Sequence, residues 1–62
     1  MFKVGDKVCS MIPNDPNFLR TAEVLQERYD PQHGEVVLIS YPEGIQSWIR
    51  AYEEKFARVV NE

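Results

Sequence analysis

Aromatic side chains are the residues of this chain best suited to recognise a ligand. Their faces stack on nucleobases, pack against apolar peptide residues and attract methylated ammonium groups through the ring quadrupole. The candidates are Phe18, Tyr29, Tyr41, Trp48 and Tyr52. Phe18 falls in a polar loop and is expected to be exposed, and Tyr41 at a hairpin corner suits binding as well as core packing. For Trp48 and Phe56, core packing is the favoured interpretation.

Acidic side chains near these aromatic residues could attract a basic ligand. An acidic rim beside aromatic rings favours peptides rich in Lys or Arg, because opposite charges guide the encounter. The acidic candidates are Asp15, Glu43, Glu53 and Glu54. The alternative is that these carboxylates form an ordinary solvated surface.

The sequence contains no catalytic motif. It lacks a nucleophile elbow, a phosphate-binding glycine loop and a metal pattern of His and carboxylate residues. His33 is the single histidine and Cys9 the single cysteine, so neither a zinc set nor an intramolecular disulfide is expected. We therefore predict a protein that is not an enzyme, with no catalytic residue, no metal and no cofactor. A lone thiol fits a reducing compartment, which predicts an intracellular protein, cytoplasmic or nuclear.

The charge balance argues against binding driven by phosphate groups. The formal net charge is −3, from ten acidic and seven basic residues, whereas nucleic-acid binding needs clustered Lys and Arg. Folding could still gather four arginines beside Trp48, namely Arg20, Arg28, Arg50 and Arg58. No apolar run approaches the roughly 20 residues that span a bilayer, so no membrane association is expected.

The length indicates a single domain, residues 1–62. A chain this short buries only about 60% of the surface that its unfolded form exposes, so its core must be thin. Self-association is one way to support such a core, and a homo-oligomer is therefore an open alternative.

The first half of the chain predicts a turn, a strand, a long loop and a second strand. Gly5-Asp6 signals the turn, and residues 7–12 suit a half-buried strand. Residues 13–17 contain two prolines, two asparagines and an aspartate, which predicts the loop. Residues 19–29 favour a strand in which Ala22 and Val24 share a face, but the helix formers within residues 21–28 leave a helix open.

The second half predicts three more strands. A reversal over residues 30–34 leads into residues 35–41, whose near-continuous apolar run implies cover on both faces, as in a closed barrel or a dimer. The turn Pro42-Glu43-Gly44 then leads to residues 45–49, which place Gln46 and Trp48 on one face. Residues 50–60 favour a short helical turn and a closing strand over residues 56–60, with a single helix as the alternative.

Three short segments carry a family resemblance over nearly the whole chain. They are Val4-Gly5-Asp6-Lys7-Val8, then Ala22-Glu23-Val24-Leu25, then residues 37–41 with the turn Pro42-Glu43-Gly44. In this order they resemble the Tudor and chromo-barrel group. The resemblance implies an all-β fold, a small five-stranded SH3-like (Tudor-like) barrel with a short helical turn before the last strand.

The same resemblance implies a place for a ligand. Tudor domains that bind methylated Lys or Arg use an aromatic cage, and Tyr41 matches one of its positions. Ile12 and Ser47 fall near the other two, where Phe18 and Trp48 would substitute.

Residues 42–48 carry a weaker resemblance to the plasmid-borne type II dihydrofolate reductases. These are small SH3-like barrels that tetramerise around a shared pore, and Gln46 preceded by Ile45 matches part of their Val-Gln-Ile-Tyr motif, with Ser47 and Trp48 at the last two positions. This resemblance implies a homotetrameric enzyme that reduces dihydrofolate with NADPH.

The favoured function is a non-catalytic interaction module that binds a protein or peptide segment through an aromatic and acidic surface. The predicted ligand-binding residues are Phe18, Tyr41, Glu43, Gln46 and Trp48. A second mode of the same function is strand addition along residues 36–39 or along the terminal strand. The alternatives are a nucleic-acid-binding SH3-like domain of a transcription or translation regulator, and the reductase.

Overall fold

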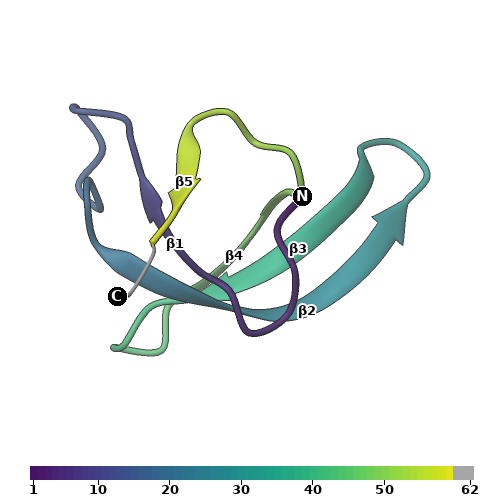
Figure 1. The fold of residues 1–62 in the computed structure, drawn as a ribbon, viewed down its shortest axis with the longest axis horizontal. Helices are drawn as coiled ribbons and strands as arrows, with labels where there is room; N and C mark the ends of the chain where they lie inside the picture. Colours follow the sequence, from purple (N-terminus) through teal and green to yellow (C-terminus); the bar gives the residue numbers. More distant parts are fainter. Residues whose placement is uncertain (60–62) are drawn as a thin grey trace.

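The chain folds into one antiparallel β-sheet, and residues 1–59, which the computed structural model describes, contain no helix (Figure 1). The five strands in this range are β1 (Lys7–Ser10), β2 (Thr21–Asp30), β3 (Gly34–Ser40), β4 (Gln46–Arg50) and β5 (Phe56–Arg58). Their order in the sheet is β4-β3-β2-β1-β5. The all-β class and the strand at residues 19–29 are thereby confirmed.

The sheet is open rather than closed into the predicted barrel. β4 and β5 form its two edges, and within residues 1–59 no backbone pairing joins them. The physical reason is the shortness of β5, which has three residues and pairs only with β1. The prediction that residues 36–39 form an exposed edge is wrong, because β3 lies between β2 and β4.

The segment before β5 forms turns and not the predicted helical turn. The Glu53 N–H donates to the Arg50 carbonyl at 3.1 Å, and the Phe56 N–H donates to the Glu53 carbonyl at 3.3 Å. Each bond closes a single turn that the next residues do not continue. The last residue of the predicted closing strand, Val60, lies outside the described residues.

The core lies against one face of the sheet. Ala22 and Val24 of β2 are both buried, which confirms that they share a face. The buried cluster consists of Phe2, Val8, Ala22, Val24, Val37, Ile39, Tyr41 and Ala51, with Ile49 and Phe56 packed against it. Phe2 joins the cluster from outside the strands and is held by a bond from its N–H to the Ala51 carbonyl at 2.9 Å.

A β-bulge at Leu25 interrupts the pairing of β2 with β3. Val24 pairs with Ile39 and Gln26 pairs with Leu38, so Leu25 is the extra residue on β2. A bulge shifts the alternation of side chains by one residue beyond the point where it occurs.

The bulge decides which side chains of β2 lie on the core side. Beyond it, Glu27 lies opposite Val37, and Tyr29 lies opposite Glu35. We call this side of the sheet the inner face, because Val37 belongs to the core, and we call the other side the outer face. Arg28, between Glu27 and Tyr29, therefore belongs to the outer face.

The turn between β3 and β4 depends on Gly44. Its φ is +92°, a backbone conformation that costs side-chain-bearing residues about 1 kcal/mol or more. The Gly44 N–H donates to the Tyr41 carbonyl at 2.9 Å, and Pro42 supplies the fixed φ that the first turn position requires. The predicted Pro42-Glu43-Gly44 reversal is confirmed.

Replacing Ile39 by Ala should lower the free energy of unfolding by about 2–5 kcal/mol, because it empties a fully packed site in a thin core. The matched control is Ile45→Ala, where the side chain is 55% exposed and a change within about 0.5 kcal/mol is expected. Urea unfolding of the three proteins measures both values. Equal losses in the two variants would contradict the core assigned to the inner face.

Candidate functional site

The five residues predicted to bind a ligand lie in two places on opposite faces of the sheet. Tyr41 continues the inner-face alternation of Val37 and Ile39, and its ring belongs to the core cluster. Trp48 lies opposite Leu38 on the outer face, and Gln46 lies two residues before it on the same strand. The structure therefore does not bring Tyr41 and Trp48 together.

Arg20 contacts both Tyr41 and Glu43 and so links the two residues. The Arg20 guanidinium lies 5.5 Å from the centroid of the Tyr41 ring and forms an ion pair with the Glu43 carboxylate. It also donates to the Asn17 side-chain oxygen at 3.0 Å. Since Arg20 already satisfies both the ring and the carboxylate, this cluster offers little to an external cation.

Asp15 and Phe18 belong to the loop beside this cluster. The Asp15 carboxylate accepts bonds from the Ser10 hydroxyl at 3.0 Å and from the Asn17 N–H at 2.9 Å. It thus holds the shape of the loop. Phe18 forms an isolated parallel bridge with Ser10 and is 38% exposed, as its place in a polar loop predicts.

Trp48 is 42% exposed, so the favoured interpretation as a core residue is wrong. The β4 edge has no further strand to cover it, which leaves the indole on the outer face beside the Arg28 guanidinium, 5.8 Å from the ring centroid. Phe56 is only partly exposed and packs against the core, as predicted. Of the four arginines predicted to gather beside Trp48, Arg28 and Arg50 line the same hollow as the indole.

The remaining two arginines lie elsewhere. Arg20 belongs to the Tyr41 cluster, and the Arg58 side chain lies 3.8 Å from the Asp6 carboxylate. Two of the four arginines predicted to gather beside Trp48 therefore do so, and two do not.

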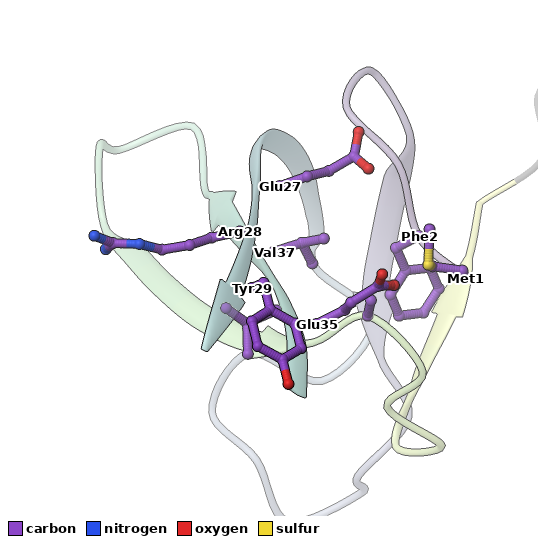
Figure 2. Close-up of a pocket in the computed structure, with 9 residues that line it drawn as sticks. Met1, Phe2, Glu27, Arg28, Tyr29, Glu35 and Val37 are labelled. Carbon is purple, nitrogen blue, oxygen red and sulfur yellow. The ribbon is translucent and has the colours of Figure 1, made fainter. Parts of the chain in front are cut away.

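A pocket of about 220 Å³ opens on the inner face, at the end of the β2–β3 hairpin (Figure 2). We call it the inner pocket. Its apolar part comes from the core residues Phe2, Val37 and Ala51, and its polar part from Glu27, Arg28, Tyr29 and Glu35. Figure 2 shows the Arg28 side chain extending away from Glu35 and Phe2, as the alternation of β2 requires.

Tyr29 and Glu35 are close neighbours across the hairpin. The Glu35 carbonyl accepts a bond from the Ala51 N–H at 2.9 Å, so the backbone of Glu35 is directed away from β2. Tyr29 and Glu35 consequently form the pair type without mutual backbone bonds, in which the Cα atoms approach to about 4.5 Å. A phenol ring and a carboxylate thus line one wall of the inner pocket.

The two carboxylates of the inner pocket form no direct ion pair with a described residue. Glu27 accepts a bond from the Val4 N–H at 3.2 Å, and within residues 1–59 neither Glu27 nor Glu35 forms an ion pair. Tyr29 is 70% exposed, so its ring is available to a ligand. The inner pocket can therefore hold a positively charged group against an aromatic ring.

Glu27 and Glu35 belong to no motif that marks them in the sequence. Tyr29 was an aromatic candidate, but simple alternation from the buried Val24 would place Gln26 and Arg28 on the core side. The signal that assigns Glu27 and Tyr29 to that side is the bulge at Leu25, which depends on pairing with a distant strand.

The described residues 1–59 contain no group of three or more His, Cys, Asp or Glu side chains that could hold a metal ion. They also contain no helix of the length and apolarity that a membrane crossing needs. Comparisons of the chain with protein-family models, curated proteins and solved structures give no significant match. Function must therefore be inferred from the chemistry of the sites themselves.

The stability of the protein should fall above about pH 10, and Tyr41 should account for a resolvable part of the loss. Burial, with a smaller contribution from the Asp15 carboxylate, raises the pKa of the Tyr41 hydroxyl. The unfolded chain then loses this proton at a lower pH than the folded chain, so unfolding becomes easier as the pH rises through that interval.

Tyr41→Phe should flatten this alkaline decline, measured as the urea midpoint between about pH 9 and pH 11. Tyr52→Phe is the matched control, because Tyr52 is 69% exposed and its loss should leave the decline unchanged. An identical alkaline decline in wild type and Tyr41→Phe would contradict the role of Tyr41.

Proposed function

We propose that the chain is a non-catalytic interaction module that binds a basic protein segment, one Lys or Arg side chain of which enters the inner pocket. The observation that carries the proposal is the placement of two carboxylates without ion-pair partners and an exposed phenol ring around an apolar floor. The residues differ from those predicted, but the chemistry is the aromatic and acidic surface expected from the sequence.

The strand order supports an SH3-like architecture for this module. β1 to β4 form a meander, and β5 returns to pair with β1. We interpret the fold as an SH3-like barrel left open between β4 and β5. This kind of scaffold hosts many unrelated functions, so the ligand class rests on the pocket alone.

Each wall of the inner pocket has a distinct task in binding a cation. The Tyr29 ring attracts it through the quadrupole, which contributes about 0.5–2 kcal/mol. Glu27 and Glu35 supply opposite charge, and Phe2 and Val37 pack against the aliphatic stem of the side chain. The volume, about 220 Å³, is below the roughly 300–1,000 Å³ of sites for drug-sized ligands, which suits a single side chain.

The test uses two small probes that differ only in charge, N-acetyl-arginine amide and its neutral analogue N-acetyl-citrulline amide. Titration of isotope-labelled protein should give NMR shift changes at Glu27, Tyr29, Glu35 and Val37 with the arginine probe, and much smaller ones with citrulline. N-acetyl-lysine amide and its trimethylated form then decide which cation the pocket prefers. Equal responses to arginine and citrulline would overturn the proposal.

Tyr29→Ala should weaken binding of the arginine probe by about tenfold, because removing the ring forfeits about 1.4 kcal/mol of cation attraction. Glu35→Gln should weaken it in the same direction and reduce its salt dependence. The matched control is Glu23→Gln, an exposed carboxylate on the same strand outside the inner pocket. Affinity unchanged in a folded Tyr29→Ala protein would show that the ring does not contact the ligand.

A further inference from the structure

The outer face of the β3–β4 hairpin carries a second hollow, of about 440 Å³, lined in part by Trp48. We call it the outer groove. Its floor includes the buried Val36, and its rim includes Arg28, Arg50 and His33. Val36 pairs with Arg28 on one side and with Arg50 on the other, so the two arginines flank the same valine.

The positive charges of the outer groove are the ones free to bind a ligand. Arg28 and Arg50 are exposed and form no ion pair with any residue in the range 1–59. The Arg28 guanidinium lies beside the indole of Trp48, at 5.8 Å from the ring centroid. A partly exposed indole in the same hollow as two guanidinium groups without ion pairs suits a ligand that is both planar and anionic.

The carboxylates of the outer groove are engaged by neighbouring turn residues. Asp30 accepts bonds from the Gln32 N–H at 2.8 Å and contacts the His33 ring at 3.1 Å, and these bonds lower the pKa of Asp30. Glu53 accepts a bond from the Lys55 N–H at 3.4 Å. Both carboxylates therefore accept bonds from local donors, whereas within residues 1–59 neither the Arg28 nor the Arg50 guanidinium donates to a protein acceptor.

We propose that the outer groove binds single-stranded nucleic acid, with one base stacked on Trp48 and the adjoining phosphates on Arg28 and Arg50. Base stacking on an exposed aromatic side chain contributes about 1–3 kcal/mol and tolerates any base. A guanidinium group donates two parallel hydrogen bonds to the oxygens of one phosphate, and a neutral peptide has no such anionic group. A base with its phosphates combines the flat apolar face and the negative charge that the groove accommodates.

This inference is independent of the proposed function. The outer groove and the inner pocket open on opposite faces of the β2–β3 hairpin, and Arg28 and Val36 contribute to the lining of both. A protein segment on the inner face and a nucleic-acid strand on the outer face can therefore bind together. Trp48 and Arg50 line only the outer groove, and Tyr29 and Glu35 line only the inner pocket, so variants at these residues distinguish failure of one proposal from failure of the other.

The first experiment titrates the wild-type protein with unlabelled oligodeoxythymidine and oligouridine while the fluorescence of Trp48 is recorded. Trp48 is the single tryptophan of the chain, so quenching reports directly on stacking at the outer groove. Both oligonucleotides should quench it, and the comparison of DNA with RNA shows whether the 2′-hydroxyl contributes. Absence of quenching by either strand at millimolar concentration overturns the proposal.

The second experiment measures anisotropy of a fluorescein-labelled oligodeoxythymidine with matched variants. Trp48→Leu should weaken binding about tenfold, equivalent to about 1.4 kcal/mol of lost stacking. Binding through two phosphates predicts a slope of about −1.4 for log K against log salt concentration. The double change Arg28→Gln with Arg50→Gln should bring this slope close to zero, whereas Arg58→Gln, on β5, should leave it unchanged.

Two competitors decide whether the anion alone explains binding. A poly-glutamate peptide of the same charge carries no planar base. A DNA duplex carries bases that are paired and stacked on one another, so they cannot stack on the indole. Single-stranded oligonucleotide should bind more tightly than either competitor. Equal affinity for poly-glutamate would show that the outer groove binds any acidic chain. Equal affinity for the duplex would show that no base stacks on Trp48. Either result overturns the proposal.

Discussion

The β-bulge at Leu25 is the feature on which the arrangement of both sites depends. By adding one residue to β2, it moves Glu27 and Tyr29 to the inner face and Arg28 to the outer face. Without it, the arginine would point toward the core side and the glutamate away from it. The bulge therefore places the Glu27 side chain on the inner face and the Arg28 side chain on the outer face of the same hairpin. Val24, which precedes the bulge, remains in the core.

The face that each charged side chain occupies matters because the thin core leaves much of the β2–β3 hairpin uncovered. The core cluster fills the inner face near Val24 and Ile39, but at the far end of β2 only Phe2 and Ala51 approach the sheet. The space left there is the inner pocket. On the outer face β4 is an edge strand, so its Trp48 indole stays 42% exposed, with the Arg28 guanidinium beside the ring. A small domain that cannot bury every aromatic residue exposes rings with defined charged neighbours.

The net charge of −3 conceals this separation of charge. Within residues 1–59, Glu27 and Glu35 lie without ion pairs at the inner pocket, beside Tyr29. In the same range, Arg28 and Arg50 lie without ion pairs in the lining of the outer groove, which also includes Trp48 and Glu53. The third cluster, of Arg20, Tyr41 and Glu43, satisfies its own charges and helps fix the turn between β3 and β4. Average composition is thus a poor guide to the ligand here, because recognition depends on charges that lack an internal partner.

Local sequence patterns were enough to predict the five strands, the loop at residues 13–17, the Pro42-Glu43-Gly44 reversal, and the shared face of Ala22 and Val24. These follow from alternation and turn chemistry, which act over a few neighbouring residues. The open sheet, the exposure of Trp48 against the burial of Tyr41, and the meeting of Glu27, Tyr29 and Glu35 are visible only in the folded chain. Those outcomes depend on the register between distant strands, and a one-residue shift at Leu25 reverses every side chain beyond it.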